Sequence, residues 1–179
     1  MKLIIINGLP GTGKTTIAKP LSEQLGFPLV SKDTIKEFLF DTIGVGDREW
    51  SKTLGKVSSE FLYGLADELL SKGHSVIIES AFEPTYAQPN IQKYIDMYHP
   101  EVFEIYCTTE KEVRRKRFEE RNESGLRHAG HQDHTNYLSK DDEEPTDKFA
   151  PIDIGLLRKI DTTRDHIDID ELVTWIKNN

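Results

Sequence analysis

The chain has 179 residues and a mass of 20.5 kDa, a length that suits one domain with its own hydrophobic core. Lys and Arg number 23 against 31 Asp and Glu, and the resulting net charge of −8 disfavours bulk electrostatic binding of extended nucleic acid while allowing a local pocket for a small anion. Cys107 is the single cysteine, which excludes an internal disulfide and a two-cysteine zinc or redox motif.

Strands and helices alternate along the predicted chain. Residues 2–7 are dominated by consecutive aliphatic side chains, a pattern typical of a strand buried on both faces of a parallel sheet. Apolar residues then recur with helical spacing over residues 14–25, until Gly26 ends the helix. The further predicted strands are residues 28–31, 75–78, 102–107 and 157–161, and the further helices are residues 33–43, 47–72, 84–98, 110–123 and 168–176.

This alternation predicts an α/β fold with a parallel sheet, formed by one domain over residues 1–179. Gly55 and Gly64 leave open whether residues 47–72 form one helix or two. The apolar run near the start, residues 3–6, is far shorter than a membrane span, so we expect a cytoplasmic protein without membrane contact.

One polar stretch, residues 124–147, fits no regular element. A loop of this length inside a compact domain is either a functional lid or a disordered insertion. Its place directly after a basic helix favours the lid, and we expect the lid region to cover residues 110–147.

The most specific motif lies between the first predicted strand and the first predicted helix. Residues 8–15 read GLPGTGKT and satisfy the P-loop pattern G-x-x-x-x-G-K-[ST]. Glycines let backbone N–H groups turn toward a polyphosphate, and the helix N-terminus adds partial positive charge. Lys14 is expected to reach the β- and γ-phosphates of ATP, and the Thr15 hydroxyl to bind Mg²⁺. The residues expected to bind the nucleotide here are Gly8, Pro10, Gly11, Thr12, Gly13, Lys14, Thr15 and Thr16.

With two further segments, this motif resembles the small P-loop kinases, the group that includes zeta-toxin-like kinases, chloramphenicol phosphotransferase and the kinase domain of polynucleotide kinase. The segments are SKDTIKE at residues 31–37 and RRKRFEERNESGLRHAGH at residues 114–131. The resemblance implies a P-loop fold with a central five-stranded parallel sheet. It also implies binding of MgATP and transfer of the γ-phosphate to a hydroxyl of a second substrate, and it names no single acceptor.

Asp33 follows the second predicted strand, at the edge of the sheet where open α/β folds bind ligands. A carboxylate there could accept the proton of the acceptor hydroxyl, the role that the resemblance implies for an acidic residue at this position. The alternative is that Asp33 only caps a helix that begins at Thr34. Lys36 could meet an anionic acceptor, although we favour a solvated surface lysine.

Glu79 ends the third predicted strand, a position from which P-loop enzymes direct a carboxylate toward Mg²⁺. We expect Glu79 to share the metal with Thr15, with an ordinary loop carboxylate as the alternative.

The basic helix carries Arg114, Arg117 and Arg121 at spacings of three and four residues, which place them on one face. Such a row could neutralise charge on a transferred phosphoryl group, and the alternative is a solvated helix with internal salt bridges. The resemblance implies that Arg117, Arg121 and Arg127 are lid arginines. Arg117 and Arg121 are expected to act in catalysis, and Arg121 and Arg127 in nucleotide binding.

Three histidines, His128, His131 and His134, recur every third residue beside Asp133. They could ligate a transition metal, contact the substrate from the lid, or be ordinary polar loop residues. Cys107 stands in an apolar strand and is expected to be a buried, inert thiol.

The sequence therefore predicts an ATP- and Mg²⁺-dependent phosphotransferase acting on a small-molecule or nucleotide-like acceptor. A polynucleotide 5′-hydroxyl kinase is the first alternative, disfavoured by the acidic net charge. A non-catalytic nucleotide switch is the second, and it lacks the NKxD element that reads guanine. Residues 41–44 match DxxG, but they fall at the end of a predicted helix and we regard the match as accidental.

Overall fold

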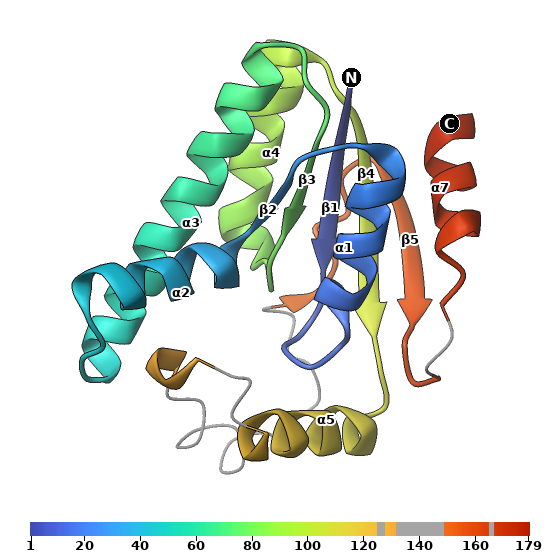
Figure 1. The fold of residues 1–179 in the computed structure, drawn as a ribbon. Helices are drawn as coiled ribbons and strands as arrows, with labels where there is room; N and C mark the ends of the chain where they lie inside the picture. The colour runs from blue at the N-terminus through green and yellow to red at the C-terminus, as the bar shows by residue number, and fades with distance from the viewer. Residues whose placement is uncertain (125–127, 132–148, 165–166) are drawn as a thin grey trace.

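The structure, a computed structural model, describes residues 1–124, 128–131, 149–164 and 167–179. A parallel sheet of five strands in the order β2-β3-β1-β4-β5 forms its centre (Figure 1). The strands are β1 (Lys2–Asn7), β2 (Leu29–Ser31), β3 (Val76–Glu79), β4 (Glu101–Thr108) and β5 (Leu156–Asp161). The predicted α/β fold with a five-stranded parallel sheet is confirmed.

Helices cover both faces of this sheet. One face packs against α1 (Lys14–Leu25) and α7 (Ile169–Asn178), and the other against α3 (Arg48–Ser71) and α4 (Pro84–Tyr98). Three further elements lie at the carboxyl ends of the strands in Figure 1: α2 (Lys32–Ile43), α5 (Lys111–Glu123) and the short 3₁₀ helix η1 (Ala129–His131). The functional residues are therefore expected at that end of the sheet.

The aliphatic run of β1 explains why both layers hold together. Successive strand residues point to opposite faces, so Leu3 and Ile5 join the core beneath α3 and α4, whereas Ile4 and Ile6 join the core beneath α1 and α7. All four side chains are fully buried. Each contributes about 1.5–3 kcal/mol to stability, which fixes β1 and the loop that follows it.

Two sequence alternatives are wrong. Helix α2 begins at Lys32, with Ser31 in the N-cap position, so Asp33 lies in the first turn and does not cap the helix. Helix α3 runs unbroken through Gly55 and Gly64, and the division into two helices does not occur.

Half of the predicted lid region, including Arg127, Asp133 and His134, lies outside the described residues. Within the ranges that the structure describes, no helix has the length and apolarity needed to cross a membrane.

Candidate active site

The P-loop turns tightly between β1 and α1, and its glycines are required there. Gly8 has φ +137°, and a Cβ on it would lie 2.3 Å from the Cys107 carbonyl oxygen of β4. Gly13, immediately before α1, has φ +76°, a left-handed conformation that L side chains rarely adopt. The Thr12 hydroxyl donates to the Leu9 carbonyl at 2.8 Å and closes the turn. The residues present thus form the narrow backbone cradle that a polyphosphate requires.

Lys14 lies inside this loop. Its side chain is largely buried, and Nζ donates to the Leu9 carbonyl oxygen at 2.9 Å. Burial lowers the pKa of Lys14, while the charges of Glu79 and Asp33 oppose that shift. The Lys14 ammonium therefore lies within electrostatic reach of two carboxylates, Glu79 and Asp33.

Glu79 lies at the end of β3 and joins the P-loop to β2. Its Oε1 accepts from the Thr15 hydroxyl at 3.3 Å, and its Oε2 accepts from the Ser31 hydroxyl at 2.7 Å. Burial raises the pKa of Glu79, and Lys14 and the hydrogen bond from Ser31 oppose this shift. A carboxylate beside a hydroxyl is a hard oxygen donor set, which suits Mg²⁺.

Asp33 lies in the first turn of α2 and is exposed. It is near enough to Lys14, Lys32 and Glu79 to influence the pKa of each. The structure thus brings Asp33 and the two predicted metal-binding residues, Thr15 and Glu79, to the same end of the sheet.

The three arginines of α5 have different surroundings. Arg114 is buried against the P-loop, since a Cβ on Gly11 would lie 3.0 Å from its Cγ. Arg117 donates to the Thr162 hydroxyl at 3.1 Å and to the Thr162 carbonyl at 2.6 Å, and the same hydroxyl donates to the P-loop carbonyl of Thr12 at 2.9 Å. Arg121 is exposed, and its charge lowers the pKa of Lys14. The row thus has one arginine against the P-loop, one on Thr162 and one exposed near the end of α5.

The outer face of α5 carries the ion pairs expected of a solvated helix. Arg115 lies 3.2 Å from Glu112, and Lys116 lies 3.7 Å from Glu120. The salt-bridged character predicted for this helix is therefore present on its outer face, and the role of the arginine row in phosphoryl transfer stays a prediction.

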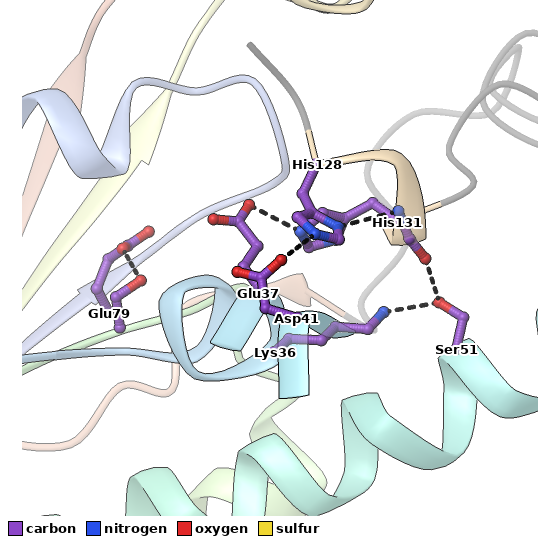
Figure 2. Close-up of polar contacts among 9 residues, drawn as sticks. Lys36, Glu37, Asp41, Ser51, Glu79, His128 and His131 are labelled. Carbon is purple, nitrogen blue, oxygen red and sulfur yellow. Dashed lines mark hydrogen bonds and ion pairs between the residues drawn. The ribbon is translucent and has the colours of Figure 1, made fainter. Parts of the chain in front are cut away.

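Two histidines attach η1 to α2, as Figure 2 shows. The backbone N–H of Gly130 donates to Nδ1 of His128, so Nε2 carries the proton and donates to Asp41 at 3.1 Å. The His128 ring stacks on Phe40, with centroids 5.2 Å apart and planes 8° from parallel. Asp41, the first residue of the DxxG match, thus lies on helix α2 and pairs with His128. Its position gives no support to a nucleotide switch.

His131 and α3 complete this attachment. Nε2 of His131 lies 3.0 Å from Glu37, and its side chain is 4% exposed. The Ser51 hydroxyl donates to the Gly130 carbonyl at 3.1 Å and accepts from Lys36 Nζ at 3.0 Å (Figure 2). Lys36 is half-buried between two helices, so the expectation of a solvated surface lysine is wrong.

The metal hypothesis for the histidines gains no support from the described residues. Among them, no group of three or more His, Cys, Asp or Glu side chains is arranged to hold a metal ion. His128 and His131 instead hold η1 against α2. His131 also lines a neighbouring cavity.

A cavity of about 920 Å³ lies between α2, α3 and the segment that follows β3. Its wall includes Lys32, next to Asp33, and Ser80, next to Glu79, so it borders the P-loop site. Small molecules bind preferentially in cavities of this kind. Its basic residues on α3 were not predicted, although Arg48, Lys52 and Lys56 recur every four residues, a pattern that indicates one helical face.

A buried polar network was also missed. The fully buried Glu104 of β4 accepts from Asn7 Nδ2 at 3.0 Å and from the backbone N–H groups of Ile152 and Asp153, each at 2.9 Å. Asn7 Oδ1 in turn accepts from the N–H of Gly8 at 2.7 Å and of Phe82 at 3.0 Å. The sequence did contain a signal for this network, because a carboxylate inside the apolar strand VFEIYC must have hydrogen-bond partners when it is buried.

A P-loop between β1 and α1, with acidic residues after β2 and β3 of a parallel sheet, defines the P-loop kinase class of α/β proteins. The profile of the AAA domain family matches residues 3–140, and the chain belongs to this family. A candidate kinase from Chloroflexus aurantiacus has a similar structure, with a TM-score of 0.86 and 34% identity over 99% of this chain and 97% of that chain.

Curated relatives include named kinases. Deoxyguanosine kinase of Bacillus subtilis is 30% identical over 107 residues, and the match covers 54% of this chain and 52% of that protein. Cytidylate kinase of Pyrobaculum neutrophilum is 30% identical over 132 residues, 72% of this chain and 65% of that protein. An uncharacterized protein of Mycobacterium tuberculosis is 24% identical over 120 residues, and this chain spans 24% of its length.

Proposed function

We propose that this protein is an ATP-dependent phosphotransferase that moves the γ-phosphate of MgATP to a hydroxyl of a small-molecule or nucleotide-like acceptor. The observation that carries the proposal is the P-loop with Lys14 inside it, joined through Thr15 to Glu79 at the end of β3, beside a cavity whose wall includes Lys32 and Ser80. The charge of Asp33 acts on both Lys14 and Glu79. The relatives named deoxyguanosine kinase and cytidylate kinase support the reaction class.

The P-loop residues bind and orient the nucleotide. Backbone N–H groups at the N-terminus of α1 face the phosphates, and Lys14 leaves the Leu9 carbonyl to contact them. Thr15 and Glu79 would hold Mg²⁺, which when bound neutralises charge on the phosphates.

Asp33 is the proton acceptor in this proposal. The acceptor oxygen forms a bond to the γ-phosphorus, the bond from that phosphorus to the β–γ bridging oxygen breaks, and the hydroxyl proton passes to the Asp33 carboxylate. Arg121 stabilises charge on the transferred group, and Arg117 keeps α5 on Thr162 beside the P-loop. Arg127 is expected to assist nucleotide binding and lies outside the described residues.

The test is a transfer screen with γ-labelled ATP against nucleosides, sugars, phenicol- and aminoglycoside-like antibiotics, nucleotides and 5′-hydroxyl oligonucleotides. Label should move from ATP to an acceptor in this pool. Lys14→Ala is the control for contaminating kinases, because it removes the phosphate-binding cation and should abolish transfer. The proposal fails if no acceptor becomes labelled, or if Lys14→Ala transfers label as fast as wild type.

A further inference from the structure

The charge of the cavity beside the P-loop is opposite to that of the whole protein. Among the described residues, its wall holds five basic side chains and two carboxylates, Glu60 and Glu83. The basic side chains are Lys32, Lys36, Arg48, Lys52 and Lys56. In a chain with net charge −8, such a local excess of cations indicates a site for an anion.

Helix α3 supplies most of this charge from one face. Arg48, Lys52 and Lys56 follow one another at four-residue spacing, so they form a row along the cavity. A parallel row of small residues, Ser51, Gly55 and Ser59, also lines the cavity. Short side chains beside long cationic ones leave room for a ligand.

Lys36 brings a cation from the opposite helix. Its Nζ donates to the Ser51 hydroxyl at 3.0 Å and lies 5.3 Å from the centre of the Phe40 ring. Lys36 thus belongs to the cavity wall as a cation held by Ser51 of α3 and by the Phe40 ring. Lys52 forms its ion pair with Glu49 on the exposed surface, at 2.6 Å, and such a pair is weak enough to be exchanged for a ligand.

Part of the remaining wall is aromatic and uncharged. Tyr63 and Phe82 lie with ring centroids 6.4 Å apart at 45°. Burial and the charge of Glu60 raise the pKa of Tyr63 to about 12, so its hydroxyl stays protonated at neutral pH. An uncharged flat body can therefore lie against these rings while an anion meets the basic row of α3.

We propose that the acceptor carries a phosphate-type anion in addition to its reacting hydroxyl, and that the basic row Arg48, Lys52 and Lys56 binds this anion together with Lys36. The inference rests on the proposed phosphotransferase function and names its substrate class. The hydroxyl lies at the Asp33 end of the cavity, and the anion lies along α3. The acceptor is thus a phosphorylated alcohol, and its neutral counterpart is a poor substrate.

The experiment compares matched pairs of compounds: nucleosides, pentoses and hexoses, each against its monophosphate. Binding is measured by calorimetry on protein saturated with Mg²⁺ and AMPPNP, a non-hydrolysable ATP analogue, so that the P-loop is occupied and only the cavity can bind the probe. Transfer from γ-labelled ATP is measured on the same pairs. At least one monophosphate should bind about tenfold or more tightly than its neutral partner.

The test variant is the double substitution Lys52→Gln and Lys56→Gln. Its control, Lys72→Gln with Lys93→Gln, removes two exposed lysines that are ion-paired with Glu68 and Asp67 and do not line the cavity. The test variant should weaken monophosphate binding and raise the acceptor KM by about tenfold or more, with kcat little changed, because these contacts are equal in the ground and transition states. The control should match wild type in all three quantities.

The outcomes separate this inference from the function on which it rests. Equal binding of neutral and phosphorylated partners, or equal effects of the two double variants, overturns the anion site even if transfer occurs. Binding of monophosphates that depends on Lys52 and Lys56, without label transfer to any acceptor, supports the anion site and overturns the kinase proposal.

Discussion

Glu79 is held in surroundings that favour its uncharged form, although a metal ligand must be charged. Burial raises its pKa, and only Lys14 and two hydroxyl donors oppose that shift. A carboxyl group whose pKa is raised by folding stabilises the fold at low pH and loses that contribution as the pH rises through the raised pKa. The ionised Glu79 therefore lowers the stability of the nucleotide-free protein at neutral and alkaline pH.

The variant Glu79→Gln should separate stability from function. Without nucleotide, its melting temperature at pH 8 should equal or exceed that of wild type, and the difference should shrink as the pH falls toward 4. Its Mg²⁺ requirement should rise by about 10- to 100-fold, a loss typical of a group that orients a metal. Thermal melts across pH and Mg²⁺ titrations of activity measure both. A lower melting temperature at pH 8 with unchanged Mg²⁺ dependence would contradict this account of Glu79.

Asp33→Asn tests the proton acceptor. Because Ser31 holds the N-cap position of α2, the substitution leaves the cap in place and removes a first-turn charge, which should cost about 0.3–1 kcal/mol of stability. The amide cannot accept the proton, so kcat should fall by about 10²- to 10⁴-fold with ATP affinity nearly unchanged. Stopped assays and calorimetry provide the values. Turnover at the wild-type rate would show that another group takes the proton.

The attachment of η1 to α2 depends on a glycine. A Cβ on Gly130 would lie 2.5 Å from Cδ2 of the Phe40 ring, so Gly130→Ala must push η1 away from α2. Since His131 lines the cavity, we expect the acceptor KM to rise by about tenfold or more, while calorimetry should show unchanged ATP affinity. Ala129→Gly, at an exposed position of the same turn, is the control. An unchanged acceptor KM in Gly130→Ala would separate η1 from acceptor binding.

The elements were largely predictable because their signals are local. Aliphatic runs marked strands, and Gly26 marked the end of α1, so the predicted ends agree with the structure within one or two residues at most positions. The P-loop could be found because its residues are consecutive in sequence. The N-cap of α2 was misassigned, because Ser31 and Asp33 are both good caps and only the start of the helix at Lys32 distinguishes them.

Contacts between elements could not be read from the sequence. The role of Lys36 depends on which face of α3 meets α2, because its hydrogen bond to Ser51 joins residues 15 positions apart in the chain. The basic row of α3 has a helical spacing, but the same spacing occurs on solvated helices. Its meaning depends on the cavity, which exists only once α2 and α3 pack together.

The network of Asn7 and Glu104 connects the two halves of the sheet. Glu104 accepts three hydrogen bonds and Asn7 accepts two, joining the P-loop to the segments that follow β3 and precede β5. Glu104→Gln replaces one acceptor oxygen with an NH₂ group that faces other donors. We expect the free energy of unfolding to fall by about 1–3 kcal/mol, the cost of buried donors left unpaired.

Urea denaturation checks this prediction, with Glu101→Gln on the same strand as the control. Glu101 pairs with Lys2 at 2.7 Å and its side chain is 56% exposed, so its loss should cost only about 0–1 kcal/mol. Equal midpoints for the two variants would show that the network adds no stability.

The same network bears on the order of events during folding. Its hydrogen bonds join residues separated by 97, 75 and 48 positions in the chain, and such long-range pairings form slowly in parallel sheets. The first residue of the P-loop, Gly8, donates to Asn7, whose amide in turn bonds to Glu104, and Glu104 takes donors as late as Asp153. During synthesis, this network around the nucleotide cradle is therefore completed only after residue 153 has been added. A nascent chain that has not yet released Asp153 from the ribosome should have no mature phosphate site.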